Sequence, residues 1–163
     1  ALTTPAPDLL ITGDGMHMAV RSKDGTLSTL RPRAGDYVRS VLGERAGMIG
    51  ELSDLDVLPG ASCSTDTCRV TLRRGNRGWR ILATRSRYLV SYTEFRTECA
   101  AADIVVSDRR LPDWCAPRWF KADRALLAKT GGLAVTLSSG SVETVAEAEG
   151  AHPWALARLS PSK

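Results

Sequence analysis

A basic β-hairpin pattern in the middle of the chain constrains the fold more than any other stretch. Residues 69–73 (Arg-Val-Thr-Leu-Arg) alternate polar and apolar side chains, which is typical of a half-buried strand. Residues 74–78 contain two glycines and an asparagine, which can supply the positive φ angles of a loop. Residues 79–83 are then predicted as the return strand. Five apolar residues can share one core: Val70, Leu72, Trp79, Ile81 and Ala83.

The same stretch is the most basic in the chain, and no acidic residue lies between Asp66 and Glu94. Its arginines are Arg69, Arg73, Arg74, Arg77, Arg80, Arg85 and Arg87. They can solvate the outer face of an edge hairpin and discourage edge-to-edge pairing, or they can form a surface for a polyanion. The first interpretation is the commoner one for a run of charges. The net charge of +4 and the pI near 9.1 permit contact with nucleic acid or anionic lipid without requiring it.

Length and composition favour one globular domain. The chain has 163 residues, 43% of them hydrophobic and 25% charged, which excludes a wholly disordered protein. No apolar run approaches the roughly 18 residues of a membrane-spanning helix. The first ten residues carry no secretory signal, and the start at Ala1 leads us to expect a processed or excised chain. We expect a linker at residues 1–7, the domain at 8–154 and a flexible tail at 155–163.

Hairpin and helix signals outside the basic stretch predict a mixed α/β domain built in layers. The predicted strands are residues 8–12, 16–22, 27–31, 103–107, 118–122, 133–137 and 141–146. The predicted helices are residues 37–45, 91–101 and 124–129. Residues 48–62 and 109–117 show no period and are predicted as loops.

The four cysteines form two local groups, Cys63 with Cys68 and Cys99 with Cys115. An even count with local pairing suits two disulfides in an oxidising compartment. A zinc site built from all four is an alternative, although the spacing from Cys99 to Cys115 is long for it and no histidine lies nearby. Free buried thiols are the third alternative.

The residues offer little for catalysis. The two histidines, His17 and His152, lie far apart and form no metal-binding motif. His17 is expected to be exposed or at a sheet edge, and His152 to pack beside Trp154. No cysteine has a neighbouring histidine as a base, and Gly-Asp-Gly at residues 13–15 is too short for a phosphate loop.

Aromatic residues alternate with cations near the end of the chain. Trp114, Trp119 and Phe120 lie among Arg109, Arg110, Arg118, Lys121 and Arg124. Such aromatic residues can stack on bases, or they can anchor the core while the cations extend to solvent, which is the commoner case.

The order of these segments resembles the C-terminal soluble part of the ComEC competence proteins, which are inner-membrane DNA-uptake channels. Residues 8–25 (DLLITGDGMHMAVRSKDG) resemble the opening strand, glycine-aspartate turn and second strand of that region. Residues 64–85 (STDTCRVTLRRGNRGWRILATR) resemble its strand, glycine turn and strand leading to Thr-Gly-Asp. Residues 102–110 (ADIVVSDRR) resemble its Ala-Asp strand before a His-His-Gly-Ser motif, and residues 150–154 (GAHPW) its closing Gly-His-Pro. The long form of residues 102–132 resembles alphaproteobacterial members.

The resemblance implies a metallo-β-lactamase-like layered α/β sandwich, here truncated and without the metal-binding motif. The family's H-x-H-x-D-H stretch corresponds to residues 30–62, which contain no histidine. Arg85 or Ser86 stands at the Thr-Gly-Asp aspartate, and Ser-Asp-Arg-Arg at 107–110 replaces His-His-Gly-Ser. His152 alone matches, so no catalytic residue, metal ligand or cofactor carries over, and the nuclease activity proposed for the family is in doubt.

The resemblance therefore implies a non-catalytic domain at the periplasmic face of the inner membrane. It would contact incoming DNA without sequence preference, or pack on the membrane channel domain of the same protein. A residual metal-dependent nuclease is the alternative. A periplasmic location favours the disulfides Cys63–Cys68 and Cys99–Cys115 over the other cysteine states. The candidate DNA-binding residues are Arg69, Arg73, Arg74, Arg77, Arg80, Arg109, Arg110, Arg118 and Lys121.

Overall fold

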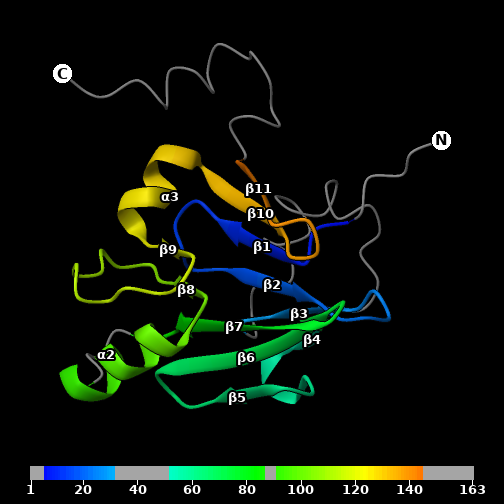
Figure 1. Ribbon diagram of the computed structural model, residues 1–163, viewed down its shortest axis with the longest axis horizontal. Helices are drawn as coiled ribbons and strands as arrows, with labels where there is room; N and C mark the ends of the chain where they lie inside the picture. Colours follow the sequence, from blue (N-terminus) through cyan, green and yellow to red (C-terminus); the bar gives the residue numbers. More distant parts are fainter. Residues whose placement is uncertain (1–5, 32–51, 87–90, 145–163) are drawn as a thin grey trace, which may run out of the picture.

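The computed structural model describes residues 6–31, 52–86 and 91–144. Within these ranges two β-sheets face each other, and two α-helices and one 3-10 helix lie against them (Figure 1). The prediction of a mixed α/β domain is confirmed. No helix in these ranges is long and apolar enough to cross a membrane.

The first sheet has six described strands in the order β11-β10-β1-β2-β3-β4. They are β1 (Leu9–Thr12), β2 (Met18–Arg21), β3 (Leu27–Thr29), β4 (Leu52–Asp54), β10 (Gly132–Thr136) and β11 (Ser141–Thr144). The strands predicted over residues 8–12, 16–22 and 27–31 are present and form the antiparallel meander β1-β2-β3, and β4 pairs with β3 in parallel. Antiparallel pairing of β10 with β1 brings the last hairpin beside the first strand.

The second sheet has five described strands in the order β5-β6-β7-β8-β9. They are β5 (Ala61–Cys63), β6 (Thr67–Arg74), β7 (Arg77–Thr84), β8 (Ile104–Val106) and β9 (Phe120–Ala122). β5, β6 and β7 are antiparallel, whereas β8 and β9 continue the sheet in parallel.

The helices cover the edges and one outer face of the two sheets. The 3-10 helix η2 (Leu55–Val57) connects β4 of the first sheet to β5 of the second. At the other side, α3 (Arg124–Thr130) packs against β9 and β10, which belong to different sheets. α2 (Tyr92–Ala101) packs on the second sheet from outside, where Phe95 meets an apolar cluster that includes Leu82.

α3 begins at its predicted first residue and ends one residue after its predicted last. The carboxylate of Asp123 accepts a hydrogen bond from the backbone N–H of Leu126, which satisfies one of the free donors of the first turn. Gly131 ends the helix in the left-handed region, with φ of 72°.

The core lies between the sheets and uses the alternate residues of the hairpin. Its buried members from β6 and β7 are Cys68, Val70, Leu72, Trp79, Ile81 and Ala83. They pack with inward-facing residues of the first sheet such as Ile11, Met18 and Val135. The five hairpin residues expected to share one core do so.

The basic hairpin is longer and its turn tighter than predicted. Arg74 pairs with Arg77, so Gly75 and Asn76 alone form the turn. Gly75 has φ of 63°, whereas Asn76 and Gly78 have no positive φ. This turn is of the two-residue type that matches the twist of a hairpin. The extra pair fixes the register and places Arg74 on the same side of β6 as Leu72.

The prediction of a loop over residues 48–62 was wrong for its described part, which contains β4, η2 and β5. Each of these elements has three residues, too few to show a period. Met16, the first residue of the predicted strand 16–22, precedes β2 and is 42% exposed. The predicted helix 37–45, most of the predicted linker, the predicted tail and His152 lie outside the described residues.

Both expected disulfides are present. Cys63 and Cys68 stand opposite each other on β5 and β6, so their disulfide links two neighbouring strands. Cys99 of α2 is joined to Cys115 in the loop after β8. Both cysteines of the second pair are buried. The alternatives of a four-cysteine zinc site and of free thiols are therefore excluded for this structure.

Candidate functional site

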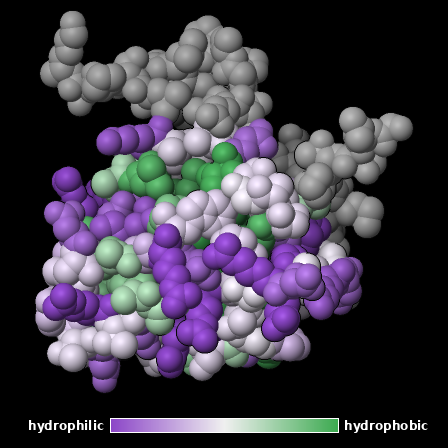
Figure 2. Space-filling view, in the orientation of Figure 1, coloured by the Kyte–Doolittle hydropathy of each residue, from purple (hydrophilic) through white to green (hydrophobic). Residues whose placement is uncertain are grey.

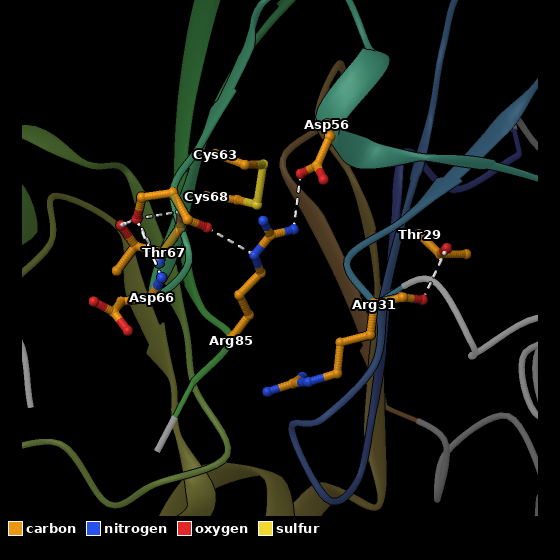
Figure 3. A network of polar contacts seen from close by, with 9 residues as sticks. Thr29, Arg31, Asp56, Cys63, Asp66, Thr67, Cys68 and Arg85 are labelled. Atoms are coloured by element: carbon orange, nitrogen blue, oxygen red, sulfur yellow. Dashed lines mark hydrogen bonds and ion pairs between the residues drawn. A yellow bond between two sulfur atoms is a disulfide. The ribbon is translucent and has the colours of Figure 1, made fainter. Parts of the chain in front are cut away.

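Arg85 lies directly after β7 and binds two neighbouring segments. Its Nη1 donates a hydrogen bond to Oδ1 of Asp56 on η2 at 2.8 Å, and its Nε donates to the carbonyl oxygen of Ser64 at 2.9 Å (Figure 3). Only 17% of the Arg85 side chain is exposed. The guanidinium therefore holds the ends of β5 and β7 beside η2.

Arg31 extends toward the same place from the first sheet, two residues after the end of β3 (Figure 3). Burial lowers the pKa of its guanidinium, the carboxylates of Asp108 and Asp14 raise it, and the charge of Arg85 lowers it. Asp14, Arg85 and Asp108 thus each lie within electrostatic reach of Arg31. Arg31 also donates through Nη1 to the carbonyl oxygen of Met16. Because arginine keeps its proton in proteins, the site carries two fixed positive charges.

The turn after β1 and the ends of β7 and β8 meet at this site. A Cβ on Gly15 would lie 2.4 Å from the carbonyl oxygen of Ser107, and φ of Gly15 is +71°. Only glycine fits there without a shift of the backbone. The hydroxyl of Thr84 donates to the hydroxyl of Ser107 at 2.7 Å in a buried contact. Residues 13–15, 84–85 and 107–108, which are far apart in the sequence, therefore form one polar cluster.

His17 lies beside this cluster and is half-buried, so the prediction of an exposed or edge histidine was wrong. Burial lowers its pKa, the carboxylate of Asp14 raises it, and the guanidinium of Arg31 lowers it. The sequence did not show this because His17 precedes the strand on which alternation would have placed it.

One group of possible metal ligands lies close together in the described part of the chain. It consists of Asp56, Cys63 and Cys68, whose ligand atoms lie within 4.8 Å of one another. The two sulfurs are joined in a disulfide, so neither is a thiolate. The carboxylate of Asp56 is paired with Arg85. This group therefore offers no metal site while the disulfide is intact.

The second candidate feature is the outer face of β6 and β7. Arg69, Arg73 and Arg80 are exposed there, on the side opposite the core residues. The side chain of Arg69 is 64% exposed and lies 3.4 Å from the carboxylate of Glu98 on α2. Figure 2 shows hydrophilic side chains over much of the visible surface of the molecule. The exposed arginines form the part of the predicted basic surface that a large anion can reach.

Two arginines at the hairpin end have structural contacts. Arg74, a candidate DNA-binding residue, is not free to reach a large anion, because its side chain is 15% exposed and its Nε lies 2.7 Å from Oδ1 of Asp8. The guanidinium of Arg77 lies over the ring of Trp79, with 3.7 Å between Cζ and the ring centroid. Its Nη2 is 3.4 Å from a carboxylate oxygen of Asp103, while 59% of its side chain stays exposed.

The predicted cations after β8 differ in exposure. Arg110 and Arg118 are exposed, whereas Arg109 is half-buried. Lys121 donates through Nζ to the carbonyl oxygen of Pro112 at 3.0 Å and so fixes the loop before β9. Of the nine candidates, Arg69, Arg73, Arg77, Arg80, Arg110 and Arg118 thus remain exposed, and Arg74, Arg109 and Lys121 are tied to the protein or half-buried.

The aromatic residues near these cations pack with other aromatic rings. The ring centroid of Trp119 lies 5.2 Å from that of Trp79 and 5.0 Å from that of Phe120. Trp114 meets the rings of Tyr92 and Phe95 edge to face. These contacts support the interpretation of the aromatic residues as anchors of the packing.

A groove of about 480 Å³ lies between the outer face of β6 and β7 and helix α2. Arg69, Thr71 and Arg80 line it from the sheet, and Thr97 and Glu98 line it from the helix. The groove was not predicted from the sequence. It depends on where α2 packs against the sheet, and the hydrophobic periodicity of a helix does not indicate that position.

Comparison of the chain with family models, with curated proteins and with solved structures finds no match.

Proposed function

We propose that this chain is a degenerate metallo-β-lactamase-like domain of a ComEC-type DNA-uptake protein and that it acts without catalysis. The proposal is supported by the order of the sequence motifs and by the cluster at the strand ends. The segments that resemble the family's metal-binding positions, residues 30–62, 85–86 and 107–110, contribute Arg31, Asp56, Arg85 and Asp108 to one site.

The pairing of Arg85 with Asp56 carries the proposal. A guanidinium has no lone pair to offer a metal, and its charge opposes the approach of a cation. Its partner Asp56 has a carboxylate oxygen within 4.8 Å of both disulfide sulfurs, and the ion pair occupies one of its oxygens at 2.8 Å. An ion pair at this position stabilises the strand ends instead of binding a catalytic metal.

The domain would contact DNA through the exposed arginines of β6 and β7. Arginines on an open sheet face contact phosphates, which are the same in every sequence. Such binding orders no new structure and needs no deep pocket. Packing on the membrane channel domain is the second role in this proposal, because an exposed basic face also suits an acidic protein surface. The two disulfides support a periplasmic location.

Purified protein is expected to contain no stoichiometric zinc or manganese and to leave supercoiled plasmid intact in Mg²⁺ or Mn²⁺. The physical reason is the guanidinium at the position that resembles a ligand. Elemental analysis measures the bound metal, and a plasmid-nicking assay measures the DNA cleavage. One equivalent of metal or more, together with nicking that His152→Ala abolishes, would identify a residual nuclease instead.

Replacing Arg69 and Arg80 together with alanine is expected to weaken binding to DNA of any sequence. The slope of log K against log salt should become shallower by roughly 0.9 for each lost phosphate contact. Fluorescence anisotropy at two salt concentrations measures both changes. A matched control is the double variant Arg124→Ala/Lys129→Ala, which removes two exposed charges from α3.

The two parts of the proposal separate in this experiment. If the wild type binds no DNA even at low salt, the DNA contact is refuted and the packing role remains. If the control variant loses as much affinity as the Arg69/Arg80 variant, binding reflects net charge and not the outer face of β6 and β7.

A further inference from the structure

A pocket of about 580 Å³ opens between the two sheets, at the end opposite Arg31 and Arg85. It lies beside the β2–β3 turn, the residues after η2 and the last residues of β6. β5 pairs with residues 68–70 of β6, so β6 runs on past the end of β5 at the pocket. The pocket has the volume of a small-molecule site, and it shares Thr71 and Arg73 with the outer face of β6 and β7.

Two serines form the floor of the pocket. Ser28 of β3 pairs with Ser53 of β4, and the neighbouring pair Leu27 and Leu52 belongs to the apolar cluster on the outer face of the first sheet. Because successive residues of a strand face opposite sides, Ser28 and Ser53 face inward, toward the second sheet. Two small side chains where larger apolar ones would fill the core leave space. Ser28 is 2% exposed, whereas Ser53 is half-buried and its hydroxyl can offer a hydrogen bond.

One wall of the pocket is apolar. Val57, Leu58 and Pro59 line it from the segment after η2, and Leu72 lines it from β6. The side chain of Val57 is 74% exposed, the largest exposure among the described large hydrophobic residues. An exposed apolar residue at the edge of a polar pocket is a contact surface for a ligand with an apolar face.

The rim carries an excess of positive charge. Lys23 and Arg73 are exposed and line the pocket, while the charge of Arg74 is balanced by Asp8. The one acidic residue of the lining is Asp24, whose Oδ1 accepts hydrogen bonds from the hydroxyl of Ser22 and from the backbone N–H of Thr26. These bonds keep the Asp24 carboxylate turned into the β2–β3 turn.

We infer that this pocket binds a monosaccharide that carries an anionic group, phosphate or carboxylate. A sugar ring has an apolar C–H face for the wall of Val57 and Leu58 and hydroxyls for Ser53. Its anionic group would lie at Lys23. The inference is independent of the proposed DNA contact.

The test is a titration of the full chain followed by ¹H–¹⁵N NMR. The probes are glucose 6-phosphate, glucuronate, glucose and inorganic phosphate. We expect the two anionic sugars to shift the amides of the β2–β3 turn and of residues 53–59, with dissociation constants in the millimolar range or tighter. Glucose and inorganic phosphate should each bind at least about tenfold more weakly, since each lacks one of the two kinds of contact.

Two variants test the pocket itself. Ser28→Leu should fill the floor and abolish the shifts, and Lys23→Glu, on the exposed rim, should weaken the anionic sugars about tenfold and leave glucose unchanged. Lys129→Ala on α3 is the control for net charge. If Ser28→Leu does not fold, the Lys23→Glu variant alone tests whether the pocket binds the anionic sugars.

Three results would overturn the inference. They are the absence of shifts with any sugar, equal shifts with inorganic phosphate, and unchanged binding to folded Ser28→Leu or to Lys23→Glu. DNA binding by Ser28→Leu should equal that of the wild type, and the Arg69/Arg80 variant should still bind the sugars. Failure of one proposal therefore leaves the other standing.

Discussion

Replacing Arg74 with alanine is expected to lower the free energy of unfolding by about 3–5 kcal/mol, the cost of leaving one partner of a buried ion pair alone. The Nε of Arg74 lies 2.7 Å from Oδ1 of Asp8, and the two side chains are 15% and 10% exposed. The guanidinium also donates to the carbonyl oxygen of Arg21. The other carboxylate oxygen of Asp8 accepts from the backbone N–H of Leu137 at 2.7 Å. Arg74 thus links the hairpin of the second sheet directly to Asp8 and Arg21, and through Asp8 to Leu137.

Urea denaturation of matched variants measures this effect. Arg73→Ala is the control, because it removes the same charge from an exposed position of the same strand and should cost under about 0.5 kcal/mol. Asp8→Asn should destabilise the protein in the same way as Arg74→Ala, because it removes the other charge of the pair. Equal losses for the Arg73 and Arg74 variants would show that the pair contributes no net stability.

The sequence held the signal for Arg74. Alternation from Val70 to Leu72 continues to Arg74, so the strand period already places it on the core side. The basic stretch contains Arg69 and Arg73 as well as Arg74, and the number of arginines alone does not distinguish the inward-facing Arg74 from the two outward-facing ones. The position in the alternation decides whether an arginine is exposed, and the run of charges does not.

Local patterns predicted the elements best where an element is long or has a sharp end. β6 and β7 show their alternation over eight residues each, and α3 has a capping Asp123 and a terminal Gly131. β4 and β5 have three residues each, and their partners in the sheets define them more than their own sequences. The pairing of β1 with β10 joins residues more than a hundred positions apart, which no window of the sequence reports.

The candidate site depends on such long-range contacts. Arg31, Arg85 and Asp108 belong to different parts of the chain, and none stands in a motif that marks it as part of a site. What brings them together is the convergence of the ends of β3, β7 and β8 at one edge. The resemblance to a family singled out two of these segments by their order alone, but it gave no reason for Arg31. The charge of a site built at strand ends can therefore be found only once the strand order is known.

Removing the Cys99–Cys115 disulfide by a double change to alanine is expected to destabilise the protein more than removing Cys63–Cys68. Cys99–Cys115 closes a loop with a sequence separation of 16, and Cys63–Cys68 closes a loop with a separation of 5. On the chain-entropy model the losses are about 3 and about 2 kcal/mol. The difference should be larger in practice, because Cys99 and Cys115 are buried in the cluster that holds α2 on the second sheet.

Thermal or urea unfolding of the two double variants, each against the wild type, measures the difference. Cys63 and Cys68 also stand opposite each other in the β5–β6 ladder, so the strands stay paired by backbone hydrogen bonds when that bond is lost. α2 has no such ladder, and its removal from the sheet would open the groove that Arg69 and Arg80 share with it. The Cys99/Cys115 variant should therefore lose more stability than the Cys63/Cys68 variant. Equal stability of the two variants would mean that apolar packing alone holds α2 in place.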